Sequence, residues 1–458
     1  MERELQFGTE FVILHFEKTF YLQRGMNMKR ILTVLLAAIV LCTCLGGVPA
    51  AAAAPAQPHW VSAWSTSPVD ASLSELGALS GVSVPVASVS SRVVIQPTLS
   101  GDRVRLVFSN EYSRLPLVIS ACSVARSVGD GASVEAGSLR RVRFHGLGCV
   151  VIPAGASVTS DPVCMTVEAG EPLAVTTFYR GLTAMRTIGL IGGRSYAAVG
   201  NYTLSPVMLP ALPLSFTADS GAYDIIPCLK EVDVRTADPD AGACVVFGDS
   251  TVANEIPRML AARLRQNGIP GVSVTQAAIK GDRLSYDGVG IIGTITGRAG
   301  VDRFEADVLD QAGVKAVIVK IGVNDVIHPN LQSKQGKAPA ASYEQLTADF
   351  SKLVELAHAR GVKVYFAELT PWKGYTRNLF GIMGDDIAWT PEIDALRVRL
   401  NDWMHSAQCP ADGAVFFPEL TDPEDEAALL AAYTTDGVHF TDAGARLAAD
   451  AIPLEWFR

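Results

Sequence analysis

The chain has 458 residues, of which 49% are hydrophobic and 19% are charged. This composition supports sizeable cores and excludes a disordered chain, and the length is enough for about two or three domains. The net charge is -9 and there is no block of Lys or Arg, which argues against nucleic acid as a partner.

The N-terminal segment has the pattern of a secretory signal peptide. A basic region at Lys29 and Arg30 precedes an apolar run from Ile31, and a tract of small residues ends near Ala54. We predict that residues 1–57 are a signal peptide with an upstream extension, and that the mature protein is extracellular. Association with the cell surface remains an alternative.

A membrane anchor is the rival interpretation of this segment. No second hydrophobic stretch of the ~20 residues that a spanning helix needs follows it. We therefore expect no stable membrane span after cleavage.

Cysteine usage fits an exported protein. Of the eight cysteines, two precede residue 57, and export would permit disulfides among the rest. The remaining six are Cys122, Cys149, Cys164, Cys228, Cys244 and Cys409. No C-x-x-C or Cys/His spacing indicates a metal site, so we expect neither a metal nor another cofactor.

The sequence pattern of residues 58–239 is typical of short β-strands. Segments such as 92–97, 103–110 and 173–179 are rich in β-branched and aromatic residues. Turn sequences such as Ser100-Gly101-Asp102 separate them. We predict an all-β, sandwich-like N-terminal domain here.

The pattern changes in residues 240–458, after a predicted linker at 237–243. Apolar strand segments alternate there with amphipathic helical segments, which predicts a parallel sheet with helices on both faces. The strand segments are 244–247, 272–277, 314–322, 362–369 and 414–417. Ligands of such sheets bind outside the carboxyl ends of the strands.

Ser250 follows the first of these strands. Serine often caps a helix, and that is the simpler interpretation of Ser250 considered alone. A nucleophilic serine needs an imidazole to accept its proton and a carboxylate to orient that imidazole. Asp436 and His439 are three residues apart in a segment where the two side chains can touch, although they could equally be a helix cap and a surface histidine.

Two further residues could stabilise an oxyanion. Asn324 follows the third strand, and its side-chain amide is a suitable donor. Gly281 follows the second strand with an unhindered backbone N–H. Each is also an ordinary residue for a turn or loop.

In their order along the chain, Ser250, Gly281, Asn324 and Asp436-x-x-His439 resemble the blocks of the SGNH (GDSL-type) hydrolase superfamily. The resemblance implies a flavodoxin-like α/β fold, with Ser250 as nucleophile, His439 as general base and Asp436 as its orienting partner. It also implies an oxyanion hole formed by the backbone N–H groups of Ser250 and Gly281 and the side chain of Asn324.

The N-terminal half strengthens this resemblance. Segments such as WVSAWSTSP and SGDRVRLVFSNEYS look like the leader domain of a secreted, two-domain subgroup of these esterases. The chain also departs from the family pattern, with Gln276 where an Asn is usual in the second block and with Lys320 inside an apolar strand.

Other enzyme classes fit less well. Residues 288–293 match G-x-G-x-x-G but follow a loop, and G-x-S-x-G does not occur. No spacing indicates the paired carboxylates of a glycosidase. A secreted carbohydrate- or surface-binding protein with a degenerate hydrolase domain is the alternative from another class.

We therefore predict a secreted serine esterase that cleaves carboxylic esters through an acyl-enzyme on Ser250. The expected substrate is a small-molecule, lipid or acetylated carbohydrate ester.

Overall fold

The structure is a computed structural model that describes residues 57–72, 84–129, 131–218, 221–253, 255–290, 293–331, 338–377 and 386–458. The predicted signal peptide lies outside the described residues, apart from Gln57. Gln57–Arg458 form one compact unit. Within the described part of the chain, no helix is long and apolar enough to span a bilayer.

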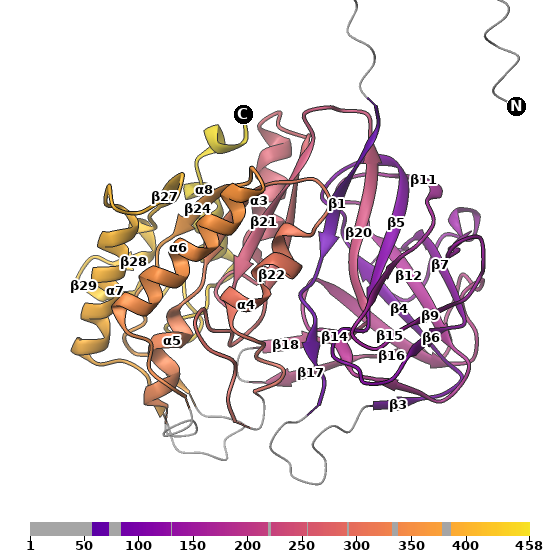
Figure 1. The fold of residues 1–458 in the computed structure, drawn as a ribbon, viewed down its shortest axis with the longest axis horizontal. Helices are drawn as coiled ribbons and strands as arrows, with labels where there is room; N and C mark the ends of the chain where they lie inside the picture. Colours follow the sequence, from indigo (N-terminus) through magenta and orange to yellow (C-terminus); the bar gives the residue numbers. More distant parts are fainter. Residues whose placement is uncertain are drawn as a thin grey trace, which may run out of the picture. The chain divides into compact units, whose positions relative to one another are not determined.

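The N-terminal region of this unit consists mainly of antiparallel strands (Figure 1). One sheet has the order β1 (His59–Ser65), β20 (Leu229–Thr236), β5 (Gly101–Ser109) and β10 (Ser157–Thr159), and β11 (Val163–Val167) also pairs with β5. A second sheet has the order β16 (Leu212–Pro213), β15 (Gly193–Val199), β4 (Val89–Ile95), β12 (Leu173–Tyr179), β7 (Ala121–Arg126) and β8 (Arg140–Arg141).

Shorter elements complete the region. They are the pairs β3 (Val84–Val86) with β13 (Thr183–Met185), β6 (Leu117–Ile119) with β9 (Val150–Ile152) and β17 (Ser215–Ala218) with β18 (Gly221–Asp224), the sheet of β19 (Ile226–Pro227), β14 (Thr187–Gly189) and β2 (Val69–Asp70), and the turn η2 (Ala136–Ser138).

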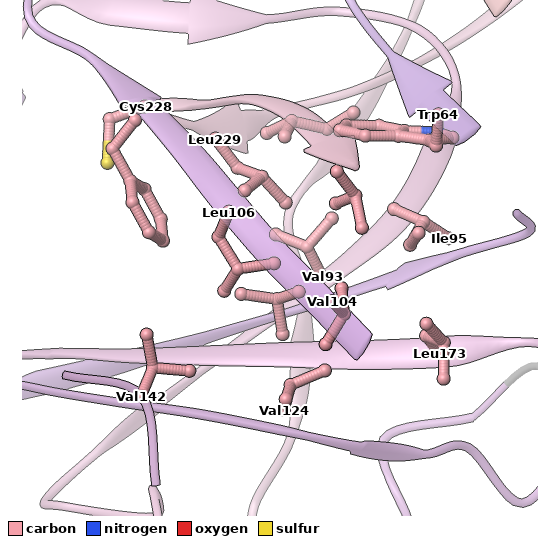
Figure 2. Close-up of a cluster of buried hydrophobic side chains, with 14 of the residues drawn as sticks. Trp64, Val93, Ile95, Val104, Leu106, Val124, Val142, Leu173, Cys228 and Leu229 are labelled. Carbon is pink, nitrogen blue, oxygen red and sulfur yellow. The ribbon is translucent and has the colours of Figure 1, made fainter. Parts of the chain in front are cut away.

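The two larger sheets share one apolar core. Side chains alternate between the faces of a strand, and in β5 the alternate residues Val104, Leu106 and Phe108 are buried. They belong to the same cluster as Val93 of β4 and Val124 of β7 (Figure 2). The packing of one antiparallel sheet on another explains why the sequence of this region reads as short, turn-separated strands.

The C-terminal region is built on a parallel sheet. Its order is β22 (Val272–Ala278), β21 (Gly242–Gly248), β23 (Val314–Lys320), β24 (Lys363–Ala367) and β27 (Gly413–Val415), and every neighbouring pair is parallel. These strands coincide with the five predicted segments to within a few residues. In chain order the arrangement is 2-1-3-4-5, which is a common order of doubly wound sheets.

Helices and short strands connect the strands of this sheet. The helical elements are α3 (Glu255–Gln266), α4 (Gly300–Phe304), η3 (Glu305–Leu309), α5 (Val323–Ile327), η4 (His328–Asn330), α6 (Tyr343–Ala359), α7 (Pro391–Met404), η7 (Pro418–Leu420), α8 (Asp442–Ala451) and η8 (Leu454–Phe457). Two further antiparallel pairs are β25 (Thr376–Arg377) with β26 (Asp386–Ile387) and β28 (Thr421–Asp422) with β29 (Asp425–Leu429).

Helices cover both faces of the parallel sheet, as predicted. Val245 packs in a cluster with Phe350 of α6, whereas its neighbour Val246 packs in another with Leu260 of α3. Since adjacent residues of a strand point to opposite faces, the two helices lie on opposite sides. A strand buried on both faces must be apolar throughout, which accounts for the run Cys244–Phe247.

Polar contacts join the β-rich region to the parallel sheet at its β22 edge. Thr98 Oγ1 lies 2.8 Å from Ser273 Oγ and accepts a hydrogen bond from Val274 N. Ser65 Oγ donates to Gln276 O at 2.7 Å. The edge strand of the parallel sheet is therefore covered by the N-terminal region rather than by solvent.

Candidate active site

Ser250 lies at the carboxyl end of β21. The strand ends at Gly248, where a Cβ atom would clash with the carbonyl oxygen of Lys320 and lie 2.5 Å from Val252 Cγ2. Glycine is thus required by the close approach of the neighbouring strand. Ser250 precedes Glu255, the first residue of α3, by five positions and is therefore too far away to cap that helix.

His439 and Asp436 lie in the loop that precedes α8. His439 Nδ1 is 2.7 Å from Asp436 Oδ2, and Asp436 Oδ1 accepts hydrogen bonds from the backbone N–H groups of Val438 and His439. Burial opposes ionisation of Asp436, but the hydrogen bonds and the charge interaction with His439 outweigh it and hold the pKa of this carboxyl below its ordinary value. The carboxylate is therefore ionised at neutral pH and fixed at both oxygens.

The loop also brings His439 to Ser250. His439 Nε2 lies 2.9 Å from Ser250 Oγ, although the two residues are 189 positions apart in the chain. The three predicted residues thus form a continuous hydrogen-bonded series from carboxylate to imidazole to hydroxyl. In such a series the imidazole can take the hydroxyl proton while the carboxylate stabilises the imidazolium that forms.

The predicted oxyanion-hole residues lie on the adjoining segments. Gly281 has φ +80°, a backbone conformation that favours glycine, and a Cβ atom there would lie 2.9 Å from Thr296 Cγ2. Asn324 is buried in the first turn of α5, and its Nδ2 donates to Asp282 O at 2.8 Å. An amide group carries two N–H hydrogens, so this bond uses only one of the donors of Asn324.

Contacts between strand ends fix the segment that contains Gly281. Ile279 N donates to Gly248 O at 3.1 Å, which places this segment directly beside the end of β21. On its other side, the Asp325 carboxylate accepts hydrogen bonds from Leu284 N and Ser285 N. The structure therefore places Ser250, Gly281 and Asn324 at the same carboxyl edge of the sheet.

Lys320 lies close to the triad, and no motif of the sequence assigns it a role. Its side chain is buried, and Nζ donates to Thr370 Oγ1 at 3.3 Å and lies 5.8 Å from the centroid of the Phe440 ring. Burial lowers the pKa of Lys320, and the carboxylates of Asp249 and Glu368 oppose this effect. A buried amine thus lies close to the loops of Ser250 and His439, and its one signal in the sequence was a lysine inside an apolar strand.

No metal centre is evident in the described ranges. Among these residues, no group of three or more His, Cys, Asp or Glu side chains is arranged to hold a metal ion.

Together, the doubly wound sheet and the Ser-His-Asp arrangement at its carboxyl edge define an α/β domain built for nucleophilic chemistry. Residues 246–447 match the GDSL-like Lipase/Acylhydrolase family. Residues 246–447 therefore form a GDSL-like Lipase/Acylhydrolase domain, which confirms the resemblance seen in the motifs after residue 240.

Solved structures with a similar chain include a GDSL-like lipase from Bacteroides thetaiotaomicron VPI-5482, at 20% identity and a TM-score of 0.33 over 46% of this chain and 85% of that one. An acetyl xylan esterase from Geobacillus stearothermophilus is 16% identical, with a TM-score of 0.33 over 46% and 94% of the two chains. The acetyl xylan esterase AlAXEase is 18% identical, with a TM-score of 0.32 over 47% and 98%. A comparison with curated proteins found no match.

Proposed function

We propose that this protein is a serine esterase that cleaves carboxylic esters through an acyl-enzyme on Ser250. The observation that carries the proposal is the hydrogen-bonded series from Asp436 through His439 to Ser250 Oγ, with distances of 2.7 and 2.9 Å. These are hydrogen-bond distances suited to proton transfer from a nucleophile to a general base.

In the proposed reaction, Ser250 Oγ attacks the ester carbonyl carbon while His439 Nε2 accepts the hydroxyl proton. The resulting tetrahedral intermediate expels the alcohol, which takes the proton from His439, and an acyl-serine remains. Water then attacks the acyl-serine, His439 again accepts a proton, and the carboxylic acid leaves as Ser250 regains its hydrogen. Asp436 keeps its charge throughout and stabilises the imidazolium of both steps.

The oxyanion of each intermediate needs donors that are in place before the reaction. We assign this role to the backbone N–H groups of Ser250 and Gly281 and to the side chain of Asn324. Support comes from the contacts that hold these residues: Gly281 lies on a segment tied to β21, and Asn324 is fixed to that segment through Asp282 O. Donors fixed in this way need no reorganisation when the charge develops.

Replacement of Asn324 with alanine tests this assignment. We expect kcat to fall on the order of 10² to 10³, with a smaller change in KM, because the donor acts mainly on the charge of the transition state. Steady-state kinetics with a chromogenic ester and a thermal melt would measure the effect.

Asn330→Ala is the matched control, because Asn330 Nδ2 also donates to a backbone carbonyl, that of Val326, but lies outside the site. Its kcat should equal that of the wild type. Unchanged kcat in a folded Asn324→Ala variant would show that Asn324 is a turn residue only.

The proposed activity itself is tested with purified protein and a panel of aryl esters, acetylated sugars and lysophospholipids. We expect turnover of a short-chain aryl ester and covalent labelling of Ser250 by a fluorophosphonate, located by mass spectrometry. The rest of the panel ranks small-molecule, carbohydrate and lipid esters as substrates. A folded protein that neither turns over any ester nor reacts with the probe would instead be the carbohydrate- or surface-binding protein with a degenerate domain.

Secretion and domain organisation are part of the same proposal. The signal-like residues 1–57 support export, to be tested by N-terminal sequencing of exported protein, which should begin between Ala51 and His59. We further assign residues 58–239 to a sandwich-like domain and residues 240–458 to the flavodoxin-like SGNH domain. The packed antiparallel sheets and the 2-1-3-4-5 strand order support this division.

A further inference from the structure

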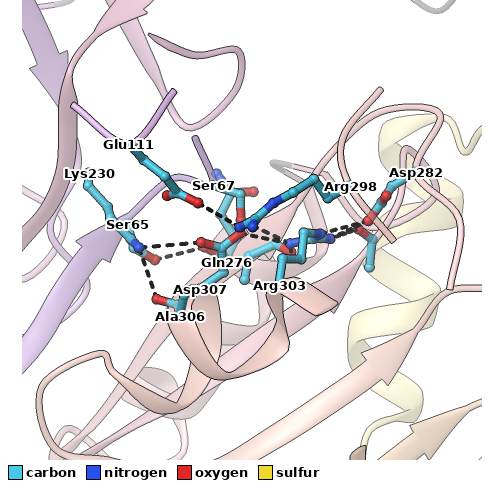
Figure 3. A network of polar contacts seen from close by, with 12 residues as sticks. Ser65, Ser67, Glu111, Lys230, Gln276, Asp282, Arg298, Arg303, Ala306 and Asp307 are labelled. Atoms are coloured by element: carbon cyan, nitrogen blue, oxygen red, sulfur yellow. Dashed lines mark hydrogen bonds and ion pairs between the residues drawn. The ribbon is translucent and has the colours of Figure 1, made fainter. Parts of the chain in front are cut away.

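A buried arginine connects the parts of the site that must keep their relative positions. Arg303 lies on α4, away from the Ser-His-Asp residues in sequence, and its side chain is 0% exposed. It is surrounded by acceptors from β21, β22, the segment after β22 and the N-terminal region. Figure 3 shows two of them, Asp282 and Ser67. We call residues 279–285, which contain Gly281, the oxyanion segment.

Arg303 contacts the ends of β21 and β22 and also the oxyanion segment. Its Nη2 donates to Gly248 O at 3.3 Å, two residues before Ser250, and its Nη1 donates to Ala277 O at 2.9 Å near the end of β22. Its Nε and Nη2 lie 2.9 and 2.5 Å from Asp282 Oδ2, in the residue directly after Gly281. One guanidinium therefore connects the end of β21, the end of β22 and the oxyanion segment.

Asp282 completes the connection. Its carboxylate is held by Arg303, while its backbone carbonyl accepts the hydrogen bond from Asn324 Nδ2. Burial raises the pKa of the Asp282 carboxyl, and the charge of Arg303 opposes that increase. Two of the proposed oxyanion donors, Gly281 and Asn324, thus depend on a residue whose position Arg303 fixes.

The N-terminal region contributes to the same arrangement. Ser67, a buried residue between β1 and β2, accepts a hydrogen bond from Arg303 Nη1 at 3.1 Å. Asp307 accepts another from Nη1 at 3.2 Å and pairs with Lys230 of β20 at 3.3 Å. The network therefore runs from Lys230 and Ser67 of the β-rich region through Arg303 to Asp282 of the oxyanion segment (Figure 3).

We propose that Arg303 is a positioning residue of the esterase reaction, which sets the oxyanion segment relative to Ser250 with the help of Ser67 from the N-terminal region. This inference rests on the proposed function. It gives the β-rich region a part in catalysis that the catalytic motifs, all of which follow residue 240, do not reveal.

The geometry explains why arginine is needed. A guanidinium presents five N–H donors in a rigid plane and can bind a carboxylate and carbonyl groups at the same time, whereas an ammonium is a single point charge. Lysine at position 303 would retain the charge opposite Asp282 but could not span Gly248, Ala277 and Asp282 together. A displacement of about 1 Å in a catalytic group can cost on the order of 10² in rate.

The test compares Arg303→Lys and Ser67→Ala with the wild type, using kcat per active site counted by fluorophosphonate titration. We expect kcat per titrated site to fall about 10- to 100-fold in Arg303→Lys and severalfold in Ser67→Ala, with little change in KM. Affinity for a boronic acid that forms a tetrahedral adduct with Ser250 should fall with kcat, because the adduct depends on the same donors.

Arg298→Lys is the control, because the ion pair of Arg298, with Glu111 across the same junction at 2.6 Å, does not involve the oxyanion segment. Its kcat should be unchanged.

A purely structural role of Arg303 would lower the titratable fraction or the melting temperature and leave kcat per site unchanged, which would overturn the inference. If Arg303→Lys does not fold, an unchanged kcat in Ser67→Ala would overturn the part assigned to the N-terminal region. Absence of ester turnover in the wild type would contradict the proposed function instead.

Discussion

Replacing Ser250 with alanine should lower kcat for ester hydrolysis by on the order of 10⁶, with the fold intact. The hydroxyl is the atom that forms the acyl-enzyme, and its hydrogen bond to His439 Nε2 is the only one of the triad contacts that the substitution removes. Residual hydrolysis above the rate in water should remain, because substrate binding and the oxyanion donors are still present. Rates are to be measured with a chromogenic short-chain ester at saturating concentration.

The control for this substitution is Ser351→Ala. Ser351 Oγ donates to Thr347 O within α6, so the variant loses a serine hydroxyl away from the proposed site. It should retain wild-type kcat and react fully with a fluorophosphonate, whereas Ser250→Ala should not react at all. An active Ser250→Ala variant would show that another group is the nucleophile.

Asp436→Asn should lower kcat by on the order of 10⁴ with little effect on folding. Asp436 accepts hydrogen bonds at both oxygens, from His439 Nδ1–H on one side and from the backbone N–H groups of Val438 and His439 on the other. An asparagine retains the backbone bonds only if its carbonyl oxygen takes them, and its NH₂ group then faces the imidazole. To pair with this NH₂ group, the imidazole of His439 must accept at Nδ1, so its proton lies on Nε2. Nε2 can then no longer accept the proton of the Ser250 hydroxyl.

Asp422→Asn is the matched control for this prediction. Asp422 also accepts from a backbone N–H two residues later, that of Glu424, but in a turn without a histidine partner. Its kcat should be unchanged. A folded Asp436→Asn variant with kcat within tenfold of the wild type would mean that Asp436 supports the loop and does not orient His439.

Local pattern was sufficient for several features of this protein. Strands buried on both faces are apolar throughout, so the run Cys244–Phe247 identified a central strand of a parallel sheet. Strands buried on one face alternate, as in 103–109, and identified the antiparallel region. The contact between Asp436 and His439 also follows from short-range geometry, because the two residues are three positions apart in one loop.

The sequence predicted the role of Ser250 only in part. Its place after a strand allowed both a helix cap and a nucleophile, and these interpretations differ in what the hydroxyl contacts. The choice depends on His439, which is 189 residues away and is brought to Ser250 by the packing of α8 against α3. No local pattern encodes that distance.

The sequence by itself determined the order of strands and helices, the family blocks and the residues available for catalysis. Only the tertiary structure decided that Arg303 contacts both Ser67 and Asp282 of the oxyanion segment. It also decided that Lys320 is buried close to the loops of Ser250 and His439. The physical reason is that a buried charge is tolerated where acceptors or opposite charges from several distant segments converge on it. The sequence around an arginine on a short helix does not indicate which acceptors from distant segments will surround its side chain.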